Sequence, residues 1–399
     1  MKAFFGLPEN VIFCKKCVIS NQRPSSTVEF KNKKNLKKET ISFGEDNICS
    51  ACKFADTKNS EIDWKLRERE LIVLLDKYRR EDGGYDVIVP GSGGKDSAYT
   101  SHVLKYKYGM NPLTVTWAPH LYTEVGWKNF TAWSHEGGHD NILFTPNGKL
   151  HRHLTKLAFL NLLHPFQPFI AGQRIIGPLM AKKFNIPLVF YGENQAEYGN
   201  NIEGNSTPTM DPSFFSSESP YDMSLGGEKV SEIIKKTDFS INDFAPYIPP
   251  SKKDLESLDI KVHYLGYYLK WDPQECYYYA VENTGFQANS ERTEGTYSKY
   301  SSIDDKVDMF HYFTTLIKFG IGRATYDAAQ EIRNGKITRE EGVLLVKKYD
   351  QEFPKKYFQE FLEYIDISEE EFWNTVDKFR SPHLWEKKNN QWFLRHSVE

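Results

Sequence analysis

The stretch YDVIVPGSGGKDSAYTSHVL, residues 85–104, constrains the fold more than any other part of the chain. Residues 87–89 form a β-branched run, which is typical of a short buried strand. Pro90 and the glycines of the next four residues then interrupt regular structure, and a helical pattern begins after Asp96. We therefore expect a strand, a glycine-rich turn and a helix in succession. The free N–H groups and the dipole at the start of such a helix bind an anion.

The turn has the composition of a phosphate-binding loop, although it matches neither the Walker A pattern nor G-x-G-x-x-G. Asp96 stands where the first pattern needs a hydroxyl residue and the second needs a glycine. Asp96 would also repel a phosphate, so we expect it either to hold Mg²⁺ or to cap the helix. Lysine and serine side chains add a cation and hydroxyl donors. The candidate set is Ser92, Gly93, Gly94, Lys95, Asp96 and Ser97.

Apolar segments and helical patterns alternate after the turn. Strands are expected at 85–90, 112–117, 141–146 and 186–194, and helices at 97–108, from about 149, and at 173–184. Such alternation predicts a parallel sheet with crossover helices, which is an α/β fold. Residues 200–260 are rich in Ser, Pro, Gly and Asn and are expected to form an irregular insertion, either a lid or a disordered excursion. Residues from 261 onward are expected to be mainly helical.

Four of the five cysteines form two C-x₂-C pairs, Cys14 with Cys17 and Cys49 with Cys52. Paired thiolates two residues apart suit a tetrahedral Zn²⁺ ion, and four of them would close its coordination sphere. The pattern therefore predicts a structural zinc site. An iron–sulfur cluster or redox-active pairs remain as alternatives.

Charge and hydrophobicity limit the range of partners. The net charge of −3 gives no sign of a dedicated nucleic-acid binder. The five lysines of residues 31–39 are expected to form a solvated hairpin tip, with a nucleic-acid contact as the alternative. There is no apolar run near the ~18 residues that a membrane span needs, and no signal peptide is recognised. We therefore expect a cytoplasmic protein without a membrane contact.

The motif SGGKDS after a buried strand resembles the pyrophosphatase loop of the PP-loop ATPase superfamily. The resemblance implies a domain of the adenine nucleotide α-hydrolase type that binds ATP, transfers AMP to a carbonyl oxygen and lets a nitrogen or sulfur nucleophile displace it. It implies catalytic roles for Lys95, Asp96 and Glu193, with Mg²⁺ as a cofactor. Adenine would meet the second strand at Thr116 and Trp117, and the nucleotide would lie near Gly192. Glu193 and Glu197 follow the last strand and could bind metal or substrate, or be solvated surface acids.

Further segments narrow the resemblance. HPFQPFIAGQ, IPLVFYGENQAEYGN, ERTEGTYSKYSSIDDKVD and IKFGIGRATYDAAQEIRNGKITREEG, together with the cysteine pairs, are similar to N-acetyl sugar amidotransferases of bacterial surface-polysaccharide pathways. The resemblance runs nearly end to end. It implies conversion of an acetamido group on a phosphorylated or nucleotide-linked sugar to an acetamidino group. Arg292, Glu294, Lys299 and Arg323 would grip the substrate, or else form ordinary salt bridges. Ammonia would come from separate glutaminase and cyclase-like subunits.

These resemblances imply five regions. They are a four-cysteine zinc module at 1–60, a linking helix at 61–84, a PP-loop ATP-binding domain at 85–205, the insertion at 206–260, and a substrate-binding region at 261–399.

Two other functions share some of these features. A PP-loop enzyme that thiolates tRNA or makes lysidine would usually be more basic, and thiolation often needs reactive cysteines. Only Cys276 lies outside the metal set, and it has no neighbouring glycine of the kind that a nucleophile elbow needs. For the same reason, and because residue 2 is Lys2, we expect no glutaminase site in the chain. A zinc-dependent interaction protein without catalytic activity is the second alternative.

Overall fold

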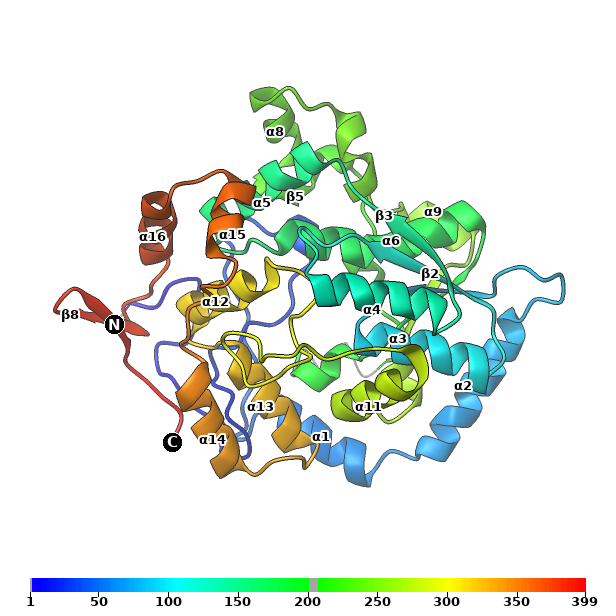
Figure 1. The fold of residues 1–399 in the computed structure, drawn as a ribbon, viewed down its shortest axis with the longest axis horizontal. Helices are drawn as coiled ribbons and strands as arrows, with labels where there is room; N and C mark the ends of the chain where they lie inside the picture. The colour runs from blue at the N-terminus through cyan, green and yellow to red at the C-terminus, as the bar shows by residue number, and fades with distance from the viewer. Residues whose placement is uncertain (1, 201–206) are drawn as a thin grey trace.

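Five strands form one parallel sheet in the computed structural model, which describes residues 2–200 and 207–399 (Figure 1). The strands are β1 (Val87–Pro90), β2 (Pro112–Trp117), β3 (Asp140–Phe144), β4 (Leu188–Tyr191) and β7 (Lys261–Tyr264). Their order is β3-β2-β1-β4-β7, and every neighbouring pair is parallel. The strand order therefore reverses between β1 and β4, and the carboxyl ends at such a point are where open parallel sheets bind ligands. The expected α/β fold is confirmed.

The fifth strand extends the sheet beyond the region that the sequence predicted for it. The alternation within residues 85–205 covers four strands, but β7 begins at Lys261 and pairs with β4 along its whole length. Its Val262 and Tyr264 are buried in the main core, which explains why so short and polar a segment holds a strand. The boundary expected at 205–206 lies outside the described residues. The domain limits stay predictions.

Helices cover both faces of the sheet because successive strand residues point to opposite sides. Ile88 and Val189 pack in one core with α5 (Gly148–Leu162) and α6 (Gln167–Phe184). Val89 and Phe190 pack in a second core with the opposite group of helices. That group comprises α2 (Trp64–Tyr78), α3 (Lys95–His102) with the π-helical turn η2 (Val103–Lys107), α10 (Leu265–Tyr268) and α11 (Pro273–Thr284). Helix α4 (Glu124–His135) lies between β2 and β3 in the chain.

The C-terminal part is mainly helical, as expected. It contains α12 (Asp308–Phe319), α13 (Arg323–Arg333), α14 (Arg339–Tyr349), α15 (Phe358–Ile365) and α16 (Glu369–Lys378). Thr338 and Glu341 form the capping box that opens α14, and Ser368 caps α16. A hairpin of β8 (Trp385–Lys388) and β9 (Gln391–Leu394) follows. Among the helices of the described ranges, none combines the length and apolarity that crossing a bilayer requires.

The N-terminal module is built around η1 (Glu29–Lys31) and α1 (Ser50–Ser60), and its chain runs beside the C-terminal helices in Figure 1. The insertion differs from the irregular segment that its composition suggests. Its described part, 207–260, contains the ribbon β5 (Ser224–Leu225) and β6 (Glu228–Lys229) and several short helices. These are η4 (Pro212–Phe214), η5 (Pro220–Asp222), α8 (Val230–Lys236), η6 (Ile241–Tyr247) and α9 (Lys252–Ser257). Phe215, Leu225 and Phe244 lie in the main core, so this segment is packed structure rather than a loose lid.

Candidate functional site

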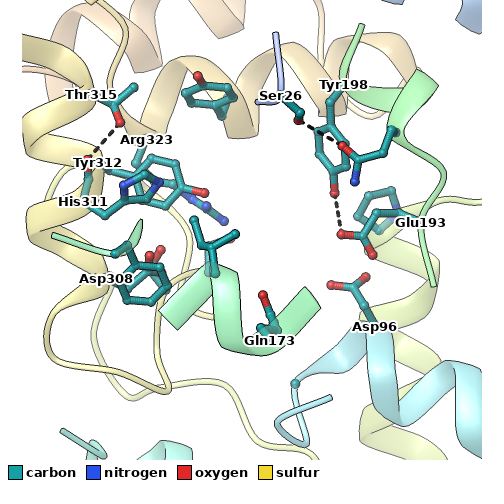
Figure 2. A pocket seen from close by; sticks show the side chains of 18 of the residues that line it. Ser26, Asp96, Gln173, Glu193, Tyr198, Asp308, His311, Tyr312, Thr315 and Arg323 are labelled. Atoms are coloured by element: carbon teal, nitrogen blue, oxygen red, sulfur yellow. Dashed lines mark hydrogen bonds between the residues drawn. The ribbon is translucent and has the colours of Figure 1, made fainter. Parts of the chain in front are cut away.

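A cavity of about 630 Å³ opens at the carboxyl ends of β1 and β4. Its walls include five parts of the chain that are far apart in sequence. They are the N-terminal segment 23–38, the glycine-rich turn after β1, helix α6, the residues that follow β4, and helices α12 and α13. Figure 2 shows the side chains of these walls facing a common space. The N-terminal module and the C-terminal helices therefore complete a site that begins at the sheet.

The glycine-rich turn needs its glycines for steric reasons. Gly93 has φ +81°, and a Cβ there would lie 2.8 Å from the Cα of Phe130. A Cβ on Gly91 would lie 2.1 Å from the Cβ of Ser97. Gly94 is the N-cap of α3 and provides no side-chain cap, so Asp96 does not cap the helix as one of its two expected roles required. The start of α3 thus faces the cavity as an anion site formed by the backbone.

The polar side chains of the turn are held by neighbours. Ser92 Oγ donates to Asp304 Oδ2 at 2.7 Å, and Ser97 Oγ donates to the carbonyl of Gly94 at 3.1 Å. Lys95 Nζ forms an ion pair with Asp96 Oδ2. Burial opposes protonation of Lys95, but the charge of Asp96 outweighs it and raises the pKa of the lysine. The protonated form of Lys95 is therefore favoured beside the glycine-rich turn.

Asp96 and Glu193 face one another across one end of the cavity (Figure 2). Burial raises the pKa of Glu193, and the charge of Asp96 raises it further. The hydroxyl of Tyr198 donates to Glu193 Oε1 at 3.2 Å, which fixes one carboxylate oxygen. Two facing carboxylates beside the glycine-rich turn repel each other, and the single positive charge of Lys95, which pairs with Asp96, offsets only part of this repulsion. They fit Mg²⁺, which takes one or two carboxylates together with phosphate oxygens.

The opposite wall is one face of α12 with the start of α13. Asp308, His311, Tyr312 and Thr315 follow helical spacing and line the cavity. Burial raises the pKa of Asp308 to about 6. The guanidinium of Arg323 lies 4.3 Å from the ring centroid of Tyr312, and its Nε lies 3.1 Å from Asp327. Arg323 lines the cavity, whereas the substrate contact that the resemblance implies for it stays a prediction.

Other predicted site residues lie elsewhere. Arg292 forms a bidentate pair with Glu352 at 2.6 and 2.8 Å, Glu294 accepts from the backbone N–H of Lys356, and Lys299 donates to the carbonyl of Ser290. None of these three lines the cavity. Glu197 pairs with a buried lysine and does not line the cavity, so it is not a solvated surface acid.

The expected adenine contacts are also displaced. Trp117 is buried against Tyr247 and Phe144, and Thr116 accepts from Asn141 in the sheet. Gly192 does line the cavity. The physical reason is that the insertion packs over the end of β2 through Tyr247 and closes it to a ligand.

Sequence reasoning missed several wall residues. Asp304, Asp308, Tyr198 and Gln173 line the cavity but stand in no motif of their own. A signal for all four was present, because each belongs to a segment quoted for the family resemblance: Gln173 to HPFQPFIAGQ, Tyr198 to IPLVFYGENQAEYGN, and Asp304 and Asp308 to ERTEGTYSKYSSIDDKVD.

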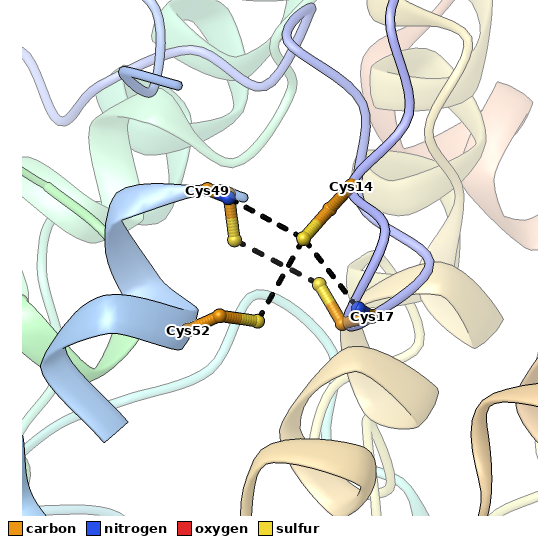
Figure 3. A group of neighbouring side chains, drawn as sticks. All are labelled: Cys14, Cys17, Cys49 and Cys52. Atoms are coloured by element: carbon orange, nitrogen blue, oxygen red, sulfur yellow. Dashed lines mark hydrogen bonds between the residues drawn. The ribbon is translucent and has the colours of Figure 1, made fainter. Parts of the chain in front are cut away.

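The four paired cysteines form one cluster (Figure 3). Their Sγ atoms lie within 4.8 Å of one another, and Cys14–Cys52 and Cys17–Cys49 are each 3.8 Å apart. A tetrahedron with Zn–S bonds of about 2.3 Å has edges of about 3.8 Å. Backbone N–H groups, among them that of Cys49 at 3.3 Å, donate to Cys14 Sγ as in metal knuckles. The donor set fits a single thiolate-bound metal ion.

Comparison with known proteins gives a family match for the C-terminal part of the chain. Residues 294–398 match the family model described as LPS biosynthesis protein WbpG-like, C-terminal domain. A search of curated proteins gives no match. The matched residues include the α12 and α13 wall of the cavity.

Two solved structures are similar at low identity. NMN synthetase from Francisella tularensis is 12% identical, with 63% of this chain and 94% of that chain covered and a TM-score of 0.26. The U34-tRNA thiolase NcsA from Methanococcus maripaludis, with its [4Fe-4S] cluster, is 15% identical, with 82% and 86% covered and a TM-score of 0.30. TM-scores this low carry no weight for function. The family match confirms the expected resemblance to surface-polysaccharide proteins, since residues 294–398 are similar to the C-terminal domain of WbpG-like proteins of LPS biosynthesis.

Proposed function

We propose that the protein is an ATP-dependent amidotransferase that converts an acetamido group of an N-acetylated, nucleotide-linked sugar to an acetamidino group. One observation carries the proposal. A backbone anion site of the PP-loop type and a wall from a polysaccharide-biosynthesis domain enclose the same cavity of about 630 Å³. That volume lies in the usual range for ligand sites.

The chemistry requires activation of a poor electrophile. The amide oxygen attacks the α-phosphorus of ATP, and the bond to pyrophosphate breaks. Ammonia then adds to the imidate carbon, the carbon–oxygen bond breaks, and AMP leaves with the former amide oxygen. The products are an amidine, AMP and pyrophosphate. The reaction requires that water be kept from the adenylylated intermediate while ammonia reaches it.

The residues of the turn would bind the pyrophosphate leaving group. The backbone N–H groups at Gly94 and Lys95 and the ammonium of Lys95 would bind its oxygens. Asp96 and Glu193 would hold Mg²⁺, which when bound neutralises phosphate charge and orients the α-phosphorus. Arg323, on the opposite wall, would contact the sugar substrate. The four-cysteine cluster would hold a structural Zn²⁺, because a cubane of four irons would force the thiolates well beyond their present spacing.

Ammonia would come from a separate glutaminase, with a cyclase-like subunit as its companion. The cytoplasm, where ATP and nucleotide sugars occur, is the compartment that this reaction requires.

The test is incubation of the purified protein with ATP, Mg²⁺, ammonium chloride and a panel of acetamido sugars and their nucleotide derivatives. Mass spectrometry should show a product in which NH has replaced an oxygen atom, with one AMP and one pyrophosphate formed per product. ADP as the nucleotide product would overturn the PP-loop assignment. ATP turnover that depends on added tRNA would favour a tRNA-modifying enzyme, and absence of turnover with every sugar would favour an interaction protein.

A further inference from the structure

Three basic side chains from three separate segments lie at the same cavity. Lys38 belongs to the lysine-rich loop of the N-terminal module, Arg174 to α6 and Lys318 to α12. Lys38 was expected at a solvated hairpin tip, but it is partly buried and turns toward the cavity, whereas the other four lysines of 31–39 are exposed. We call these three residues the basic subsite.

Phe5 contacts two of the three residues of the basic subsite, and the charge of Glu29 acts on all three. Phe5 accepts from the backbone N–H of Lys38 at 2.6 Å, and its ring centroid lies 5.5 Å from Lys318 Nζ. The charges of Arg174 and Lys38 both act on the carboxylate of Glu29, which lies 3.6 Å from His164 Nε2. Lys318 lies on the same face of α12 as His311 and Thr315, one turn further along, and it also lines the cavity. The basic subsite therefore continues the wall that faces Asp96 and Glu193.

The positive charge of the basic subsite is not balanced by the protein. Within 2–200 and 207–399, neither lysine nor Arg174 forms an ion pair, and Glu29 is the one carboxylate whose charge acts on Lys318. Lys318 is only 6% exposed, and its ammonium donates to the carbonyl of Leu162 at 2.6 Å. Arg174 Nε is buried and has no hydrogen-bond partner in the same ranges. When Lys318 is protonated, three cations face one carboxylate, and this excess of two positive charges is costly in a buried site unless an anion lies beside it.

We propose that Lys38, Arg174 and Lys318 bind the phosphate or diphosphate group of the sugar substrate. An excess of two positive charges matches a phosphate monoester or a diphosphate diester. A guanidinium with a free Nε can bind such a group with two parallel hydrogen bonds. The identity of the substrate as a sugar rests on the proposed function, whereas the binding of a phosphorylated ligand does not. The arrangement would place the acetamido group between the subsite and the glycine-rich turn.

The test is calorimetric titration in the presence of Mg²⁺ and a saturating non-hydrolysable ATP analogue, which occupies the glycine-rich turn. The probes are UDP-N-acetylglucosamine, N-acetylglucosamine 1-phosphate and N-acetylglucosamine. The two phosphorylated probes should bind at least about tenfold more tightly than the neutral sugar, because charge-assisted hydrogen bonds to phosphate are lost in the latter. The stronger of the two identifies a diphosphate or a monophosphate as the natural group. Equal binding of all three would overturn the proposal.

Variants assign the effect to the basic subsite. Lys318→Met and Arg174→Met should each weaken binding of the phosphorylated probe about tenfold or more. Binding of the neutral sugar should stay unchanged. Lys336→Met is the matched control, since Lys336 lines the same cavity but is already paired with Asp272 and Glu275. Lys38→Met, on a partly exposed loop, tests the subsite if a helix variant fails to fold. Unchanged binding in these variants contradicts the proposal. Because no turnover is measured, the result is independent of whether AMP is formed.

Discussion

Lys58 Nζ donates a hydrogen bond to Glu197 Oε2 at 2.8 Å, and both side chains are buried. Lys58 lies in the last turn of α1, the helix that begins at the cysteine cluster, and Glu197 lies in η3 (Gln195–Tyr198), directly after β4. The same ammonium donates to the carbonyl of Trp271 and to Asn334 Oδ1, each at 3.0 Å. One side chain thus joins the metal module, the sheet and the end of α13. Through η3 it supports Tyr198, which positions Glu193.

Breaking this pair should destabilise the protein strongly. Lys58→Met leaves the carboxylate of Glu197 buried without its partner, which typically costs about 3–5 kcal/mol. The double variant Lys58→Met/Glu197→Gln should recover part of that loss because no unpaired charge remains. Urea denaturation measures both. A loss below about 1 kcal/mol in the single variant would mean that the pair is solvated and weak.

Metal content tests the cysteine cluster. Wild-type protein should contain one zinc ion per chain by elemental analysis. Cys49→Ser should lose it, and it should also lose ATP turnover because α1 supports the loop that carries Glu193. Cys276→Ser is the matched control and should keep the metal, since Cys276 is buried in the core beside the sheet. Iron in place of zinc, or full metal retention in Cys49→Ser, would contradict the assignment.

The Mg²⁺ requirement should depend on pH through Glu193. Its pKa is raised by burial and then by Asp96, so the folded protein takes up this proton at a higher pH than an exposed glutamate does. The proton competes with the cation, and the Mg²⁺ concentration for half-maximal ATP turnover should therefore rise as the pH falls toward the raised pKa. Glu193→Gln should bind Mg²⁺ more weakly at every pH and lose this dependence. The same pH dependence in Glu193→Gln would exclude Glu193 as its source.

The local sequence predicted the strands, turns and motifs of the site better than it predicted which distant residues its side chains contact. Residues 112–117, Gly93 and the cysteine pairs could be interpreted because the determining chemistry lies within a few residues. Glu197 and Trp117 could not, because Lys58 and Tyr247 lie more than a hundred residues away and decide whether each side chain meets a ligand or a core. Ser92 likewise finds Asp304 across 212 positions. What could be predicted about the site was limited by contacts between residues far apart in the sequence, not by the strength of its motifs.

Stability should rise with pH above neutrality because of Lys318. Burial, and then the charge of Lys38, lower the pKa of Lys318 from 10.5 to about 7. Between these values the unfolded chain binds a proton that the folded protein does not, so the free energy of unfolding increases with pH, by up to about 1.4 kcal/mol per unit. His164 and His311 face Lys318, but burial lowers the pKa of both and they stay neutral in this range. Glu29 stays ionised there.

Lys318→Met removes this contribution. The variant should be more stable than the wild type below about pH 7, and the gain should shrink toward pH 10. Thermal melts across this range measure the difference, and the comparison cancels the parallel titration of Lys38. If the variant is more stable but binds the phosphorylated probe more weakly, Lys318 contributes to ligand binding and lowers the stability of the free protein. A pH-independent difference would mean that Lys318 stays charged in the folded protein.

The chain should be unable to obtain ammonia from glutamine. Glutamine hydrolysis normally uses a reactive cysteine thiolate. Four cysteines are gathered in the candidate metal site, and Cys276 is 2% exposed in the core between α2, α3 and the sheet. Burial, and then the charge of Asp96, raise the pKa of Cys276 well above its usual value, so the nucleophilic thiolate is disfavoured. With ATP, Mg²⁺ and the sugar substrate, glutamine alone should therefore give no amidine, whereas ammonium chloride or glutamine with a separate glutaminase should give it. Cys276→Ser should keep the ammonium-dependent activity. Activity of the pure chain with glutamine alone, abolished in Cys276→Ser, would instead place a glutaminase site at this buried thiol.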